Sequence, residues 1–108
     1  MSDITQRGAM IKDDNNVPVG FNYVNITGQA TTLVKTGAGF LHSITFNKPV
    51  ATGTVKIDDA ITDTTPIIGT ITTPASPQPY TVFYDIAFAV GLTIVTGTAS
   101  QDLTISYI

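Results

Sequence analysis

The chain lacks cysteine, tryptophan and glutamate, and it has only five Lys and Arg residues among 108. Without cysteine it can form no disulfide, no thiol nucleophile and no cysteine-ligated metal site. The net charge of −3 argues against a general nucleic-acid-binding surface, which needs clustered cations. No apolar run approaches the roughly 18 residues of a membrane-spanning helix. The N-terminus has no basic start followed by an apolar run, so we expect no signal peptide.

Residues that favour helices are also scarce, whereas β-branched residues are abundant. The chain has four leucines, against 19 threonines, 13 isoleucines and 9 valines. Branching at Cβ restricts χ1 in a helix but packs well on a pleated sheet. A chain of 108 residues is the size of one domain and is long enough to bury a core without disulfides. The composition therefore predicts a single all-β domain.

Short segments of alternating polar and apolar residues recur along the chain, separated by Gly, Pro and Asp. This rhythm is typical of a β-sandwich or a small barrel. We expect an antiparallel β-sandwich, jelly-roll or immunoglobulin-like, over residues 20–108, preceded by an extended N-terminal arm over residues 1–19. The eight expected strands cover residues 21–27, 30–36, 40–47, 53–58, 67–73, 80–88, 92–96 and 103–108.

Alternation also predicts which side chains are buried, because successive residues of a strand point to opposite faces. The phase stays open for residues 80–88, where Phe83 is the alternative inward residue. The side chains expected in the core are Phe21, Tyr23, Val34, Ile44, Phe46, Val55, Ile57, Val82, Ile86, Leu92, Ile94, Leu103 and Ile105.

His42 is the only histidine, and a period of two places it on the same face as Phe40, Ile44 and Phe46. Its neighbour Ser43 then points the other way, so the two residues do not form a nucleophile and its base. We interpret His42 as a hydrogen-bonded residue of the core or of a subunit interface.

Aspartates cluster at Asp13 and Asp14 and again at Asp58, Asp59 and Asp63. Asp58 and Asp63 of the second cluster, with carbonyl groups of a loop, could hold Ca²⁺, but they lack the regular spacing and the bidentate Glu of a calcium loop. Turn formation is the preferred interpretation, because Asp forms local hydrogen bonds with the backbone. We expect no catalytic residue, no metal, no cofactor and no enzymatic activity.

Some expected strands carry apolar side chains on both faces. A single sandwich buries only one face of each sheet, so the apolar side chains of the other face remain exposed. In residues 80–88, Phe83 opposes the face that carries the other aromatic side chains. Surplus apolar surface favours contact with a second copy of the chain, so we expect a homo-oligomer. Asp85 either faces solvent or joins this contact. The residues expected at the subunit interface are His42, Tyr84 and Asp85.

Four segments resemble sequences of small virion proteins of tailed bacteriophages. They read TTLVKTGAGFLHSI (31–44), GTVKIDD (53–59), YDIAFAVGLTIVT (84–96) and DLTISY (102–107). The resemblance implies a head decoration protein that binds the major capsid protein, lies on the virion surface and is made in the host cytoplasm. It also implies a trimer, without contact to membrane or nucleic acid. The alternative is a phage tail or fibre module, or a β module that binds a receptor or carbohydrate.

Residues 1–19 have no counterpart in that resemblance and lack the alternation of a core strand. Their short apolar groups could add to the edge of a neighbour's sheet, and Pro18 stiffens the segment. We expect this arm to anchor the domain on the capsid, with a frayed terminus as the alternative. The residues expected to contact the capsid are Arg7, Met10, Ile11, Lys12, Val17 and Val19.

Overall fold

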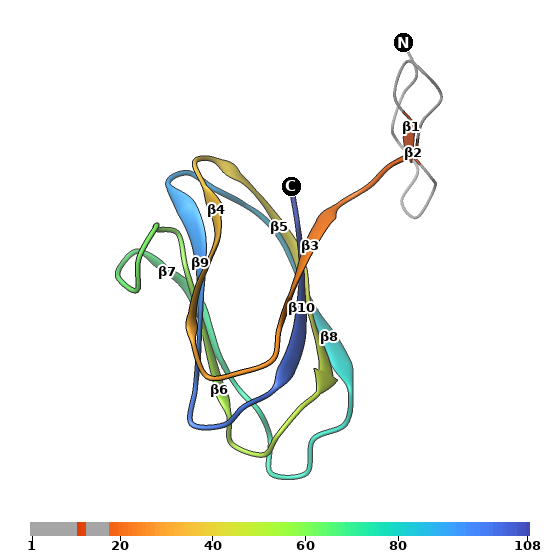
Figure 1. Ribbon diagram of the computed structural model, residues 1–108, viewed down its shortest axis with the longest axis vertical. Coiled ribbons are helices and arrows are strands. Elements are labelled where there is room, and N and C mark those ends of the chain that lie inside the picture. The colour runs from red at the N-terminus through yellow and green to blue at the C-terminus, as the bar shows by residue number, and fades with distance from the viewer. Residues whose placement is uncertain (1–10, 13–17) are drawn as a thin grey trace.

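The computed structural model describes residues 11–12 and 18–108 (Figure 1). Ten strands and no helix occur in this part of the chain, so no described segment could cross a membrane as a helix. Two short strands, β1 (Ile11–Lys12) and β2 (Pro18–Val19), pair with each other. The other eight are β3 (Asn22–Ile26), β4 (Thr31–Thr36), β5 (Gly39–Lys48), β6 (Thr54–Asp58), β7 (Ile67–Thr72), β8 (Tyr80–Phe88), β9 (Gly91–Gly97) and β10 (Asp102–Tyr107).

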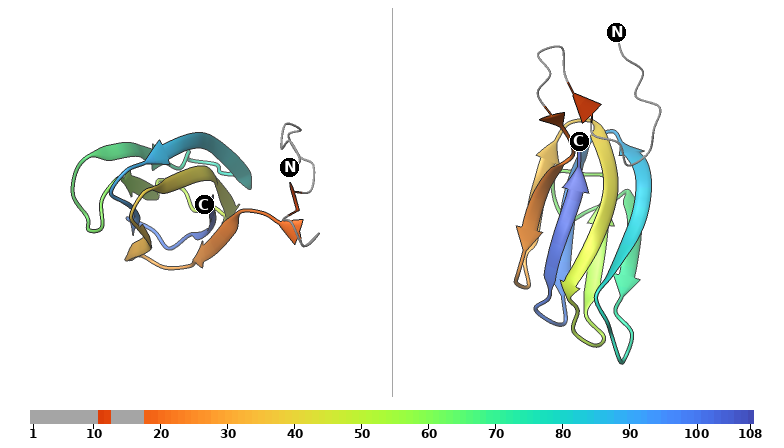
Figure 2. Two further views of the ribbon diagram at one scale, coloured as in Figure 1. Left: turned by 90° about the horizontal axis from the view of Figure 1, so that it is seen from above. Right: turned by 90° about the vertical axis from the view of Figure 1, so that its right-hand side faces the viewer.

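These eight strands form two four-stranded antiparallel sheets that face each other (Figure 1, Figure 2). One sheet has the order β3-β10-β5-β8 and the other the order β4-β9-β6-β7. Every connection among them except that from β6 to β7 crosses from one sheet to the other, which gives the strand order of a jelly roll. The expected antiparallel β-sandwich is confirmed, and the jelly roll is the topology found.

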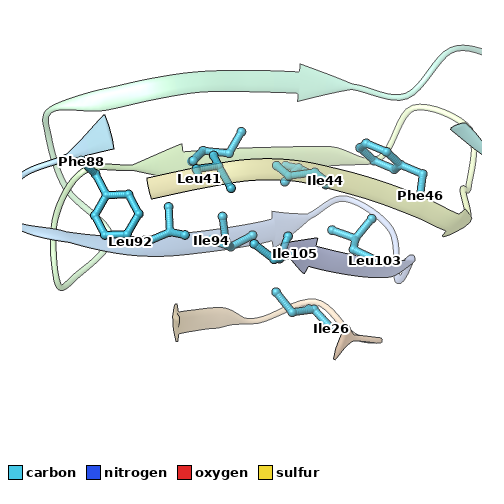
Figure 3. Packing of buried hydrophobic residues seen from close by; sticks show 11 residues of the cluster. Ile26, Leu41, Ile44, Phe46, Phe88, Leu92, Ile94, Leu103 and Ile105 are labelled. Carbon is cyan, nitrogen blue, oxygen red and sulfur yellow. The ribbon is translucent and has the colours of Figure 1, made fainter. Parts of the chain in front are cut away.

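The core lies between the two sheets and is built from one face of each strand (Figure 3). Phe46 is fully buried and stacks on Tyr80, with ring centroids 4.5 Å apart. Phe88 and the β-branched and leucine side chains of the facing sheets fill the rest of the layer, as strand alternation requires. The buried cluster comprises Ile26, Leu41, Ile44, Phe46, Val55, Ile57, Phe88, Leu92, Ile94, Leu103 and Ile105.

Three side chains expected in the core are exposed instead. Tyr23 is 74% exposed, and Phe21 and Ile86 are each 42% exposed. Val24 and Ile26 are the β3 residues that pack against the core, so Tyr23 points to the opposite face. Phe21 precedes the strand, and Ile86 belongs to β8, which has a neighbour on only one side. The other ten expected residues are buried, with Val34 and Val82 only partly so.

The prediction that His42 shares a face with Ile44 is wrong. Leu41 takes that inward position and is fully buried, whereas His42 is half-buried on the opposite face. The cause is a β-bulge, because Leu41 and Ser43 of β5 pair with consecutive residues of β10. Because β5 has one extra residue at this point, Leu41 and Ile44 both point into the core although they are three positions apart.

Much of the expected N-terminal arm lies outside the described residues, including Arg7, Met10 and Val17. Ile11, Lys12 and Val19 belong to the β1–β2 pair, in which Ile11 lies opposite Val19. The chain enters the sandwich at the start of β3, at the end that also carries the β8–β9 turn (Figure 1). Contact between this segment and a capsid stays a prediction.

Candidate functional site

The surface of sheet β3-β10-β5-β8 that points away from the core, the outer face, carries exposed aromatic side chains at both of its edges. One row across the sheet runs from Tyr23 through Ser106 and Ser43 to Phe83, because these residues pair in register on the four strands. Tyr23 is 74% exposed and Phe83 is 65% exposed. Since neighbouring strands lie about 4.8 Å apart, the backbones of these two residues are separated by roughly 14 Å. The row has bulky edges and a middle of small side chains.

The next row of the outer face is polar throughout. Asn25, Thr104, Thr45 and Thr81 pair in register across the same four strands. The hydroxyl oxygens of Thr45 and Thr81 lie 3.0 Å apart and share a hydrogen bond. Small hydroxyl groups therefore form the floor between the aromatic edges.

A carboxylate ties this polar row together. Oδ1 of Asp102 accepts hydrogen bonds from the side-chain amides of Asn25, at 2.7 Å, and Asn47, at 3.1 Å. The Asn47 amide also donates to the Thr104 hydroxyl at 2.9 Å. These bonds fix the orientation of both amides. The amide oxygens and Oδ2 of Asp102 are then directed groups that can accept hydrogen bonds from a ligand.

His42 lies at one end of the outer face, between two phenylalanine rings. Its imidazole stacks on Phe21 with centroids 4.2 Å apart, and it meets Phe83 edge-to-face with centroids 5.5 Å apart. Nδ1 of His42 lies 2.6 Å from Oδ1 of Asp85. Asp85 has a φ of +50°, at a bulge where β8 has one more residue than β5 between paired positions. Asp accepts this left-handed backbone more readily than most residues, so the bulge brings its carboxylate to the imidazole.

The partners of the His42 ring are the Asp85 carboxylate and two phenylalanine rings. One imidazole face is also covered by Phe21. The pair holds the ring in a fixed position within an aromatic cluster.

A second constellation fastens the loop of residues 59–66, between β6 and β7. The Asp59 carboxylate accepts hydrogen bonds from the backbone N–H groups of residues 89–91, at 3.0, 2.8 and 3.3 Å. These bonds, that of Ala89 first, stabilise the ionised form and lower the pKa of Asp59. The N–H of Asp59 also donates to the Pro66 carbonyl at 2.9 Å. One residue thus closes its own loop and joins it to the β8–β9 turn.

Exposed aliphatic side chains surround this clamp. Ile61 is 48% exposed, Ile67 47% and Val90 52%, and we call these three residues the end patch. Ile61 packs closely over Gly91, where a Cβ would come within 2.9 Å of its Cγ2 and of the Lys35 carbonyl. The patch is therefore an apolar surface formed by the fastened loop, the start of β7 and the β8–β9 turn, and such a surface suits contact with another protein.

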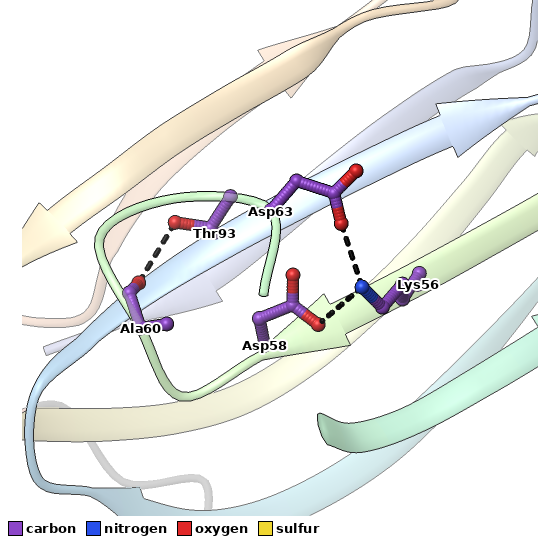
Figure 4. Close-up of polar contacts among 5 residues, drawn as sticks. All are labelled: Lys56, Asp58, Ala60, Asp63 and Thr93. Carbon is purple, nitrogen blue, oxygen red and sulfur yellow. Dashed lines mark hydrogen bonds and ion pairs between the residues drawn. The ribbon is translucent and has the colours of Figure 1, made fainter. Parts of the chain in front are cut away.

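Asp58 is fully buried beside the same loop (Figure 4). The Lys56 ammonium lies 3.4 Å from Oδ1 of Asp58 and 2.6 Å from Oδ1 of Asp63. The hydrogen bond to Asp63 is the main reason that the pKa of Lys56 is raised. A cation of the chain itself thus occupies the space between the two carboxylates that we considered for Ca²⁺. Residues 11–12 and 18–108 contain no group of three or more His and Asp side chains that could hold a metal.

Two of the three residues expected at a subunit interface lie together, and the third does not. His42 and Asp85 share the outer face, whereas Tyr84 packs against the core of its own chain. Burial raises the pKa of the Tyr84 phenol, whose oxygen lies 2.8 Å from where a Cβ on Gly69 would be. The contact between subunits stays a prediction.

Sequence reasoning missed most of the polar half of the outer face. Neither Asn25 nor Asn47 was expected to bind a ligand, and Tyr23 was expected in the core. A signal was available, because Asn25 follows Tyr23 by two residues and so marks the same face of β3 as polar. The pairing of both asparagines with Asp102 carries no such signal, since β3 and β10 lie far apart in the sequence.

Comparison of the chain with protein-family models, with characterised proteins and with solved structures gives no match.

Proposed function

We propose that this protein is a head decoration protein of a tailed bacteriophage, a non-enzymatic jelly roll that binds the major capsid protein on the assembled head and stabilises the shell. The observation that carries the proposal is the end patch, in which Ile61, Ile67 and Val90 are exposed at the end of the sandwich where Asp59 joins the 59–66 loop to the β8–β9 turn. The four segments that resemble phage virion proteins support it. Jelly rolls occur in viral capsid proteins and in lectins, so the fold is compatible but does not decide the function.

The size of the end patch favours a weak contact that many copies make together. Each of its three side chains is about half exposed. Burying a whole aliphatic side chain contributes about 1.5–3 kcal/mol, so covering each exposed half contributes about half of that value. The entropy lost on association offsets much of that gain. A shell that carries many copies tolerates such a modest affinity for each one.

Residues 1–19 are the second part of the proposed attachment. The chain enters the sandwich at the start of β3, at the same end of the molecule as the β8–β9 turn and its Val90 (Figure 1). Apolar residues of the preceding segment could therefore extend the contact that the end patch begins. This is the anchoring role expected from the sequence.

We further propose that the protein acts as a homo-oligomer, with the trimer taken from the resemblance alone. Large apolar side chains remain exposed outside the end patch, among them Leu33 at 49% and Ile108 at 51%. Light scattering at micromolar protein concentration should return three times the mass of one chain. A monomer mass would refute the oligomer, and a dimer would refute the trimer.

The test of the capsid contact is cosedimentation with purified heads that lack the protein. The wild-type protein should sediment with the heads, and Ile61→Asp or Val90→Asp should lower the bound fraction about tenfold, because each places a charge in the contact. Val50→Asp is the matched control, since Val50 is 38% exposed at the other end of the sandwich, between β5 and β6. Thermal melting by circular dichroism would show that all three variants are folded.

Two results would contradict the proposal. If the end-patch variants bind heads as well as wild type, the patch is not the contact. If the wild-type protein sediments with tails and not with heads, the protein belongs to the tail or fibre, which is the alternative.

A further inference from the structure

The outer face differs in chemistry from the end patch, and the proposed contact with the capsid does not use it. It combines exposed aromatic rings with oriented amide, hydroxyl and carboxylate groups, whereas the end patch is aliphatic. We propose that the outer face of sheet β3-β10-β5-β8 is a binding site for a neutral oligosaccharide. This goes beyond the proposed decoration role and uses a different surface.

The aromatic side chains at the two edges of the outer face offer surfaces on which sugar rings can pack. Tyr23 and Phe83 are among the most exposed large side chains of the described chain and stand at opposite ends of one row. The C–H groups on the face of a sugar ring pack well against the electron-rich face of an aromatic ring. Two such rings stand at the ends of one row, with Ser106 and Ser43 between them.

The polar row offers groups that can form hydrogen bonds with a sugar. Neighbouring hydroxyl groups of a sugar need donors and acceptors at matching positions, and the Asn25–Asp102–Asn47 group offers three planar acceptors side by side. Hydrogen bonds within the group hold these side chains before any ligand arrives, so little side-chain entropy is lost on binding. The Thr45 and Thr81 hydroxyls continue the polar floor toward Phe83.

An aromatic cluster lies at one end of the outer face. The Phe21 and His42 rings are parallel within 6°, and Phe83 packs against the imidazole at an interplanar angle of 66°. The contact between His42 Nδ1 and Asp85 Oδ1 holds the imidazole ring of this cluster in place. Ser43 is only 6% exposed beside it, so the accessible floor is the polar row and not the row of serines.

Charge selects a neutral ligand. The carboxylates of the outer face belong to Asp85 and Asp102, and of these Asp85 is paired with His42. Lys48 is the single Lys or Arg of these four strands and pairs in register with Asp102, so the face has no surplus positive charge to attract an anionic glycan. An apolar peptide segment would leave the amides and hydroxyls without partners, which costs more than the aromatic contacts return. A neutral sugar suits both parts of the outer face, because its C–H groups pack on the aromatic rings and its hydroxyl groups form hydrogen bonds with the amides and threonines.

The test is affinity electrophoresis of the full chain in native gels that contain mannan, a β-glucan or a galactan. Polygalacturonate serves as the anionic comparison. We expect at least one neutral polysaccharide to retard the protein and polygalacturonate not to. Tyr23→Ala and Phe83→Ala should each weaken the retarding affinity about tenfold, and Asn47→Ala should do the same through the polar row. Leu33→Ala is the matched control, because Leu33 is an exposed apolar residue, 49% exposed, on the other sheet.

The outcomes separate this proposal from capsid binding. Loss of polysaccharide binding in the outer-face variants, with head binding intact, supports it. Retardation by none of the neutral polysaccharides, or retardation that Tyr23→Ala and Phe83→Ala leave unchanged, would overturn it. Loss of head binding in these two variants would also overturn it, because the face would then be a protein contact. The end-patch variants should keep their polysaccharide binding even if the capsid proposal fails.

Discussion

Asp59 is the residue on which the geometry of the end patch depends most, and its replacement tests that geometry directly. In Asp59→Asn one carboxylate oxygen becomes an amide nitrogen, and the charge that binds the β8–β9 turn is lost. Both wild-type carboxylate oxygens accept from the Ala89 N–H at 3.0 Å, and Oδ1 also accepts from the N–H groups of Val90 at 2.8 Å and Gly91 at 3.3 Å. We expect the free energy of unfolding to fall at neutral pH, with a matching loss of head binding.

The magnitude follows from these bonds. A hydrogen bond to a charged acceptor contributes about 1.5–3 kcal/mol, but water can replace part of it at a turn that is partly exposed. The asparagine also retains one acceptor oxygen. We therefore expect a loss of about 1–2 kcal/mol, which lowers the melting temperature by roughly 4–16 °C in a domain of this size.

The pH dependence gives a sharper check. The pKa of Asp59 is lowered in the folded protein, so its contribution is complete above the unfolded value of about 3.9 and is lost as the pH falls through the folded value. The difference between wild type and Asp59→Asn should therefore be constant near neutral pH and should narrow in acid. In the same loop, Asp63→Asn removes an exposed pair with Lys56 and should lower the free energy of unfolding less than Asp59→Asn does. Urea unfolding followed by circular dichroism measures both, and an Asp59→Asn effect that is absent, or equally large in acid, would refute the reasoning.

Three further changes test other parts of the fold. Phe46→Ala removes a fully buried ring that stacks on Tyr80, and it should cost about 3–5 kcal/mol in urea unfolding; a cost below about 1 kcal/mol would contradict the core as described. Thr98→Asn should raise the stability by about 1 kcal/mol, because Thr98 is β-branched at a φ of +68° and Asn tolerates that backbone better; a lower melting temperature would count against this. Lys56→Met should lower the melting temperature more than Lys35→Met does, since it leaves the buried Asp58 carboxylate without a counter-charge, and equal effects of the two would show that Asp58 does not depend on Lys56.

The strands were predictable from the sequence because their apolar residues alternate against threonine, serine and asparagine. Val55 and Ile57 in β6, and Leu103 and Ile105 in β10, point inward as a period of two requires. The local signal is strong where each strand has one apolar face, and it locates the turns at Gly and Pro as well.

The errors arose where backbone geometry overrides a strict period of two. The bulge at His42 moves Leu41 into the core. The sequence does not reveal the bulge, because Phe40 and Leu41 are both apolar and either could be the inward residue. A bulge in β8 likewise brings Asp85 to His42, although 43 residues separate them along the chain. The strand order and the Asn25–Asp102–Asn47 group depend on such distant pairings, which periodicity within a strand does not encode.

The most direct test of the proposed function is a cryo-electron microscopy reconstruction of heads incubated with the purified protein, compared with the same heads without it. The account predicts added density on the outside of the shell, with the 59–66 loop and the β8–β9 turn against the capsid surface and the outer face of sheet β3-β10-β5-β8 open to solvent. Unchanged heads, or added density in which Tyr23 and Phe83 lie against the capsid, would contradict it.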